Sequence, residues 1–141
     1  MESNTALILN GLGSGLPILL LHFVATVLLF LGGVAAYVAV TPMRERQLLA
    51  SGNRAAGILL GGTVVALAIP LAATLATSLS LLDIVIWGAI ALVLQIVTFG
   101  IAVLLFRDLR PMIENGNVAA ATTLAALQLA IALLNAGAMA G

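Results

Sequence analysis

The feature that most constrains this chain is an uninterrupted apolar run from Leu16 to Val40, in which His22 and Thr26 are the only distinctly polar side chains. At about 1.5 Å per residue, a helix of this length covers more than the roughly 30 Å of a bilayer's hydrocarbon core. The whole chain of 141 residues is 63% hydrophobic and 7% charged, which leaves too little polar surface for a soluble domain. We therefore expect lipid to be the solvent.

Three further apolar runs follow, and each is long enough to cross a membrane. We expect spans from about Ala55 to Ala76, from about Ile84 to Phe106, and from Val118 to Ala140. The predicted fold is therefore an all-α membrane protein with four transmembrane helices. Within the second span, Gly57 and Gly61 lie four residues apart, a spacing that lets two helices approach closely.

The charged residues predict an orientation. All five basic residues lie in or beside two of the connections between spans, and they are Arg44, Arg46, Arg54, Arg107 and Arg110. Because cytoplasmic loops retain Lys and Arg, these two connections are predicted to be cytoplasmic and both termini extracytoplasmic. Three acidic residues in the same loops, Glu45, Asp108 and Glu114, are interpreted as charges that dilute the basic patch.

The two arginine-bearing loops contain the same motif. Gly52-Asn53-Arg54-Ala55-Ala56 returns 64 residues later as Gly116-Asn117-Val118-Ala119-Ala120, and Arg46 aligns with Arg110 at the same offset. In the first copy, Gly52 suits the turn that ends a short interfacial helix, and Asn53 can cap the next span. We expect such a helix over 43–51 and again in the second loop. The predicted organisation is an extracytoplasmic segment (1–15) and two parallel two-helix repeats (16–78 and 79–141).

Together with this double motif, the turn Ser78-Leu79-Ser80-Leu81-Leu82-Asp83 that leads into Trp87-Gly88 resembles the YjfL-like bacterial inner-membrane proteins. The resemblance covers nearly the whole chain. That family is catalogued as a domain of unknown function, so the resemblance implies a bacterial inner-membrane location and the duplicated hairpin, but no activity and no functional residues. Some members lie near genes of a phage-shock-type envelope-stress protein, which implies such a protein as a cytoplasmic partner.

Two carboxamides are prominent among the polar groups inside the spans. Counted from the cytoplasmic ends, Gln95 and Gln128 lie roughly 18 and 16 Å deep, near the middle of the bilayer. One interpretation is a hydrogen bond between them that packs the third helix on the fourth, worth about 0.6 kcal/mol and at most about 2. The other is that copies from several subunits line a pathway. Thr98, one turn from Gln95, extends either network.

A second polar group is predicted near the outer face, and it comprises His22, Thr74, Ser78, Asp83 and Asn135. Ser80 and Asp83 have the spacing of a capping box, so Asp83 has a structural role at the start of the third helix. The functional alternative is a His22–Asp83 pair that binds a proton or a cation. One His and one Asp cannot form a metal centre in a single subunit, so no metal site is predicted.

The sequence contains no catalytic or cofactor motif, and we expect neither an enzyme nor a bound cofactor. Two functional classes remain open. The first, favoured by the glutamines, is a homo-oligomer that forms or gates a pathway for an ion or small solute. The second is a membrane scaffold whose inner loops, through Arg46 and Arg110, recruit the envelope-stress partner. Membrane lipids are expected partners of the arginines, and nucleic acid is not.

Overall fold

The computed structural model describes residues 3–41 and 44–141, and within them the chain forms six helices and no strand. The helices are α1 (Asn4–Val40), α2 (Glu45–Ala50), α3 (Arg54–Thr77), α4 (Leu81–Leu105), α5 (Leu109–Glu114) and α6 (Val118–Ala140). Four of them, α1, α3, α4 and α6, are long and apolar enough to cross a membrane. The predicted all-α fold with four membrane-spanning helices is therefore confirmed.

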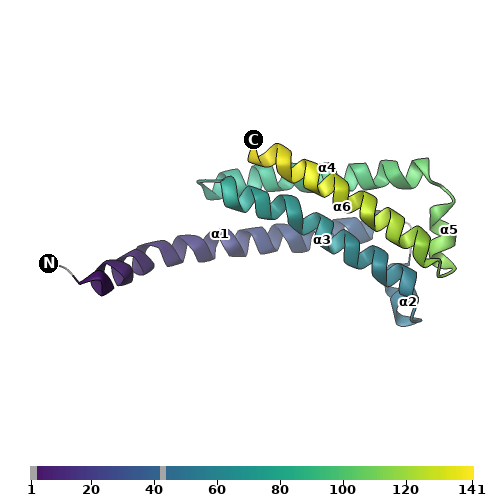
Figure 1. Cartoon of the computed structure of the whole chain (residues 1–141), viewed down its shortest axis with the longest axis horizontal. Helices are drawn as coiled ribbons and strands as arrows, with labels where there is room; N and C mark the ends of the chain where they lie inside the picture. The colour runs from purple at the N-terminus through teal and green to yellow at the C-terminus, as the bar shows by residue number, and fades with distance from the viewer. Residues whose placement is uncertain (1–2, 42–43) are drawn as a thin grey trace.

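The short helices α2 and α5 lie at the same end of the molecule, which we call the α2/α5 end (Figure 1). The turn between α3 and α4 and the C-terminus lie at the opposite end. Helix α2 occupies most of the short helix predicted over 43–51, of which residue 43 lies outside the described residues. Helix α5 (109–114) begins and ends 64 residues after α2 (45–50).

The same turn precedes α3 and α6. Gly52 and Gly116 have φ angles of 77° and 84°, in the left-handed region that glycine adopts without steric cost. Asn53 and Asn117 follow them, and each side-chain oxygen accepts a hydrogen bond from the backbone amide three residues on, at 3.0 and 3.1 Å. These bonds satisfy amides that the start of a helix leaves without a partner. The predicted Asn53 cap is therefore confirmed, and Asn117 forms the same cap at the repeated motif.

The first helix begins earlier than predicted. We expected a span from Leu16, whereas α1 starts at Asn4 and contains 37 residues, or roughly 55 Å of helix. The Ser3 side chain caps this start, and Pro17 lies inside the helix without ending it. The glycines at 11, 13 and 15 each destabilise a helix by about 1 kcal/mol relative to alanine, which weakens the helix but does not prevent it. The N-terminal part of α1 consequently extends past the other long helices (Figure 1).

Helices α3 and α6 form the most extensive contact of the bundle. At their closest approach, a Cβ atom added to Gly62 would lie 2.5 Å from the Ala125 Cβ atom. The predicted close-approach positions were wrong, because a Cβ at Gly61 would meet nothing within 4 Å and one at Gly57 only the Leu49 side chain. Successive residues point about 100° apart around a helix, so a shift of one residue turns the contact to a different face.

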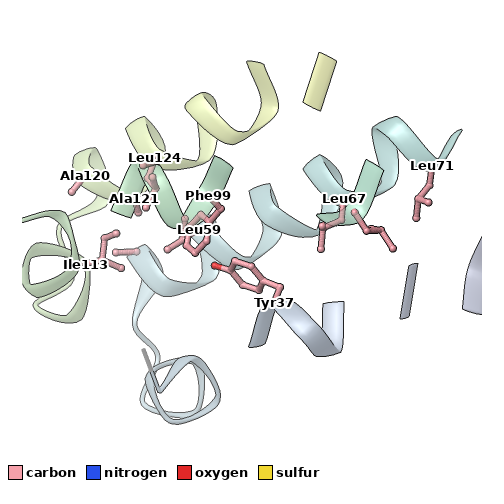
Figure 2. Packing of buried hydrophobic residues seen from close by; sticks show 12 residues of the cluster. Tyr37, Leu59, Leu67, Leu71, Phe99, Ile113, Ala120, Ala121 and Leu124 are labelled. Atoms are coloured by element: carbon pink, nitrogen blue, oxygen red, sulfur yellow. The ribbon is translucent and has the colours of Figure 1, made fainter. Parts of the chain in front are cut away.

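Helix α1 lies at the edge of the bundle, with only Thr26, Gly33 and Tyr37 buried. Figure 2 shows Tyr37 projecting from α1 toward α3 and α4, and its ring centroid lies 4.9 Å from that of Phe99. Tyr37 thereby joins α1 to the core at the α2/α5 end. The core cluster also includes Leu59, Leu67, Leu71, Ile113, Ala120, Ala121 and Leu124 (Figure 2).

Candidate functional site

Two buried glutamines join α4 to α6 near the middle of both helices. Gln95 is 3% exposed and Gln128 is 1% exposed. Gln95 Nε2 donates to the backbone oxygen of Gln128 at 3.0 Å, so the two residues do meet, although through the main chain of the second. Gln95 Oε1 and Gln128 Nε2 are buried without a hydrogen-bond partner among the described residues. Both glutamines thus lie in the interior of one protomer.

Asn135 forms a second link between the same two helices. Its Nδ2 donates to the backbone oxygen of Ala91 at 3.0 Å, one turn of α4 away from Gln95. Asn135 Oδ1 is buried and has no hydrogen-bond partner in the part of the chain that the structure describes. The interface between α4 and α6 therefore contains three carboxamides, Gln95, Gln128 and Asn135, which we call the amide line.

Thr98 does not extend the amide line. Its hydroxyl donates to the backbone oxygens of Leu94 and Gln95, at 2.8 and 3.0 Å, within its own helix. Threonine hydroxyls in membrane helices are commonly satisfied in this way. Thr98 is therefore a neighbouring polar position whose hydroxyl bonds only to α4.

The predicted outer polar group is gathered only in part. Thr74, Ser78 and Asp83 line a hollow of about 460 Å³ at the end opposite α2 and α5. His22 and Asn135 are not among its lining residues, and no hydrogen bond or ion pair joins His22 to Asp83 within residues 3–41 and 44–141. Asp83 instead forms the predicted cap, because Ser80 Oγ donates to its Oδ2 at 2.7 Å and accepts from its backbone amide at 3.2 Å.

At the α2/α5 end, Asn53 ties the two short-helix connections together. Its Nδ2 donates to the backbone oxygens of Ile113 and Glu114 in α5, at 3.1 and 3.0 Å. Arg110 pairs with Glu114 at 3.0 Å, and Arg46 is exposed. A hollow of about 520 Å³ lies between the two short helices and is lined by Arg44, Gln47, Leu48, Ser51, Arg110 and Glu114. The aligned Arg46 is therefore not part of this hollow, whereas Arg110 is.

Glu45, which the sequence predicted to lie on the surface of the first arginine-bearing loop, is buried in the structure. Glu45, the first residue of α2, is 4% exposed, and Tyr37 is 1% exposed. The Tyr37 hydroxyl faces the side chains of Glu45, Thr41 and Thr63. None of these contacts has the distance and direction of a hydrogen bond, so Tyr37 Oη and both Glu45 carboxyl oxygens are buried without a partner in the described ranges. Burial raises the pKa of Glu45, and the Tyr37 hydroxyl partly opposes this effect.

One signal in the sequence could have found Glu45. In a helix, residues three and four positions apart share a face, and Leu48 and Leu49 follow Glu45 at those spacings. An acid on the apolar face of a short amphipathic helix points toward the bundle or the bilayer. Tyr37, the one tyrosine of the chain, lies at the adjacent end of the first span and offered a polar partner.

The chain is similar to known proteins over most of its length. The family model described as Domain of Unknown Function (DUF350) matches residues 11–139. The chain belongs to the DUF350 family. Two relatives of Escherichia coli, from strain K12 and from O157:H7, are both named UPF0719 inner membrane protein YjfL, and each is 35% identical over 116 residues, which cover 82% of this chain and 86% of the relative. The resemblance to YjfL-like proteins is therefore confirmed.

This DUF350 protein is thus a multi-pass inner-membrane protein of a family without a known function. No solved structure matches the chain. The described residues contain no group of three or more His, Cys, Asp or Glu side chains placed to hold a metal ion. The amide line and the buried pair of Glu45 and Tyr37 are consequently the two sites whose chemistry requires an explanation.

Proposed function

We propose that this protein is a homo-oligomer that forms or gates a pathway for an ion or small solute across the inner membrane, with its α2/α5 end in the cytoplasm. The orientation is supported by the five arginines, which all lie in or beside the loops at that end. The amide line supports the pathway. The exposed face of α1 and α4 supports assembly.

Unpaired polar atoms in the amide line carry the proposal. Gln95 Oε1, Gln128 Nε2 and Asn135 Oδ1 are buried inside membrane-spanning helices without a partner among the described residues. A buried polar atom left unpaired costs about 1–3 kcal/mol, and hydrocarbon supplies no water to relieve it. Polar groups that persist inside a membrane at such a cost commonly mark ion or solute paths. Water or a permeating species between α4 and α6 would supply the missing partners.

The buried position of these amides changes how a pathway would be built. A path along the amide line runs inside each protomer, between α4 and α6, and not between subunits as the sequence suggested. In this arrangement, the amide line of a single protomer supplies the polar wall of the path. Assembly with other copies is then not needed to form that wall.

The proposal of assembly rests on an apolar groove between α1 and α4. The groove has a volume of about 490 Å³, and small residues, Ala25, Gly32 and Ala36 of α1 and Ala89 of α4, lie along it. Small side chains let a further helix approach closely, which is how membrane helices associate in the absence of a hydrophobic driving force. A helix from a second copy would fill this groove and cover the exposed side of α1.

Flux through reconstituted vesicles tests the pathway. Proton flux is followed with an entrapped pH-sensitive dye, and potassium flux with an entrapped potassium dye. We expect the wild type to conduct at least one of these ions faster than empty vesicles, and Gln95→Leu with Gln128→Leu to abolish that flux at unchanged oligomer size. Thr98→Val is the matched control and should conduct normally, because its hydroxyl bonds only within α4. A flux through the double variant equal to that through the wild type would refute the proposal.

A second candidate function has its own observation. The hollow between α2 and α5 places Arg44 and Arg110 together at the proposed cytoplasmic surface, where they could hold an acidic partner such as the envelope-stress protein. On this scaffold proposal, Arg44→Ala with Arg110→Ala should release a cytoplasmic protein in pull-downs. Arg46→Ala, outside the hollow, should retain it. Retention by the double variant would contradict the scaffold.

A further inference from the structure

Glu45 is an acidic residue, and within residues 3–41 and 44–141 no basic side chain forms an ion pair with it. The arginines that flank it in the chain, Arg44 and Arg46, are exposed, and so are the other three arginines of the protein. Tyr37 of α1 is the titratable side chain that faces the carboxyl group, and α3 contributes the Thr63 hydroxyl beside it. Glu114 of α5 pairs with Arg110 on the surface.

An isolated carboxylate in such a place is expensive. Removing an ionised carboxyl group from water costs so much that a buried acid usually becomes neutral by holding a proton. At 4% exposure, with both oxygens unpaired, Glu45 meets this description. Among the described residues, no arginine pairs with Glu45 to neutralise its charge. A proton is therefore the simplest neutralising ligand.

We propose that Glu45, together with the hydroxyls of Tyr37 and Thr63, forms a proton-binding site at the α2/α5 end. The evidence for this proton-binding site comes from its own contacts. The proposal does not depend on whether ions or solutes pass along the amide line.

The hydroxyls define two states of this site. Thr63 Oγ1 already donates its hydrogen to the Leu59 backbone oxygen at 2.9 Å, so toward Tyr37 it can only accept. With Glu45 ionised, the Tyr37 hydroxyl can donate to the carboxylate. With Glu45 protonated, the new carboxyl O–H can donate to Tyr37 Oη, which frees the Tyr37 hydrogen to turn toward Thr63. Each direction needs only a small side-chain adjustment, because the groups already face one another.

Proton uptake therefore changes how α1, α2 and α3 are held together. One proton comes from a hydronium ion in the water at the α2/α5 end, whose O–H bond breaks as an O–H bond forms on Glu45. The new carboxyl O–H donates to Tyr37 Oη, and the Tyr37 hydrogen changes its acceptor from α2 to α3. No other covalent bond is made or broken. A site of this kind can report the pH at that membrane face to the helix bundle.

Infrared spectroscopy of the full-length protein in lipid bilayers tests the site. A protonated carboxyl group has a C=O stretch that an ionised one lacks, and we expect this band to persist in the wild type above the pH range in which exposed glutamates ionise. Glu45→Gln should lose the persistent band. Glu114→Gln should keep it, because Glu114 is an acid of α5 that pairs with Arg110 on the surface.

Tyr37→Phe separates a proton site from a purely structural one. Removing the hydroxyl that stabilises the ionised carboxylate should move the disappearance of the band to higher pH. Absence of a persistent band in the wild type would overturn the proposal. So would its loss when sodium chloride replaces choline chloride, since a metal cation would then be the ligand. Both results are independent of vesicle flux, which tests the pathway alone.

Discussion

The two connections that contain α2 and α5 share a frame but differ in chemistry. Both have a short helix of the same length, a left-handed glycine and a capping asparagine. Glu45 begins α2 and is buried, whereas Leu109 begins α5 at the equivalent position. The residue that corresponds to Tyr37 is Ile101, which is 51% exposed on the outer face of α4. The first connection alone therefore has a buried acid, and this acid faces the phenol of Tyr37 near the end of α1.

The spans show the opposite division. Gln95 and Gln128 belong to the second half, and the residues 64 positions earlier are the apolar Leu31 and Val64. The loop motif thus gives the two halves a common backbone geometry. The polar residues of the interior lie at positions where the residue types of the two halves differ. The sites to test are therefore those where the two halves differ in their contacts. Gly62 and Asn53 can be tested against their counterparts Ala126 and Asn117, and the buried Glu45 against the surface acid Glu114.

The largest effect is expected where only one half permits close helix contact. Gly62→Val should destabilise the fold by about 3 kcal/mol, because even a Cβ atom there would lie 2.5 Å from Ala125 Cβ and neither backbone can easily withdraw. The counterpart Ala126 is exposed, so Ala126→Val should change stability by less than about 0.5 kcal/mol. Unfolding in mixed detergent micelles measures both. Equal effects would mean that α3 and α6 pack through another face.

A smaller effect separates the two asparagines. Asn53→Ala should cost about 2 to 3 kcal/mol, because it removes a helix cap and two hydrogen bonds to α5. Asn117→Ala should cost about 1 kcal/mol, since Asn117 makes the cap alone among the described residues. The same unfolding assay decides. If the two variants lose equal stability, the Asn53 bridge between the connections contributes nothing.

The third and smallest effect is confined to a pH window. Burial raises the pKa of Glu45, so the folded protein holds this proton more tightly than the unfolded chain does. The free energy of unfolding should therefore fall as the pH rises from the ordinary glutamate value of 4.5 to the raised folded value, and it should stay lower above that window. Glu45→Gln, neutral at every pH, should remove this fall, whereas Glu114→Gln should leave it. A pH profile of Glu45→Gln that matches the wild type would assign the fall to another group.

Much of the fold could be predicted from the sequence because a bilayer permits few solutions. Four apolar runs required four helices, since only helices satisfy their own backbone in lipid without forming a closed barrel. The Gly-Asn motif marks where α3 and α6 begin, because glycine and asparagine act through local backbone geometry. The start of α1 could not be predicted in the same way, since the early glycines and Pro17 weaken a helix without prohibiting it.

The candidate site was less predictable because it depends on which way each helix faces. The depth of Gln95 and Gln128 followed from counting residues, and their contact followed from the short connection between their helices. The rotation that turns Gly62 and not Gly61 toward Ala125 of α6 does not follow from spacing alone. Glu45 was missed because a charged residue between two arginines in a loop is usually solvated, and only the packing of α2 against α3 places it inside.

Labelling of single cysteines can show whether the interior between α4 and α6 is a hydrated path. The chain contains no native cysteine, so a small water-soluble thiol reagent reports only the introduced residue. Thiols react as thiolates, which form in water and not in hydrocarbon. We expect labelling of Gln128→Cys and Asn135→Cys in membranes, and none of Leu134→Cys, which is 75% exposed on the outer face of the same helix. Failure of both interior positions to react, while an exposed loop position such as Asn115→Cys reacts, would show a dry interface and contradict the pathway.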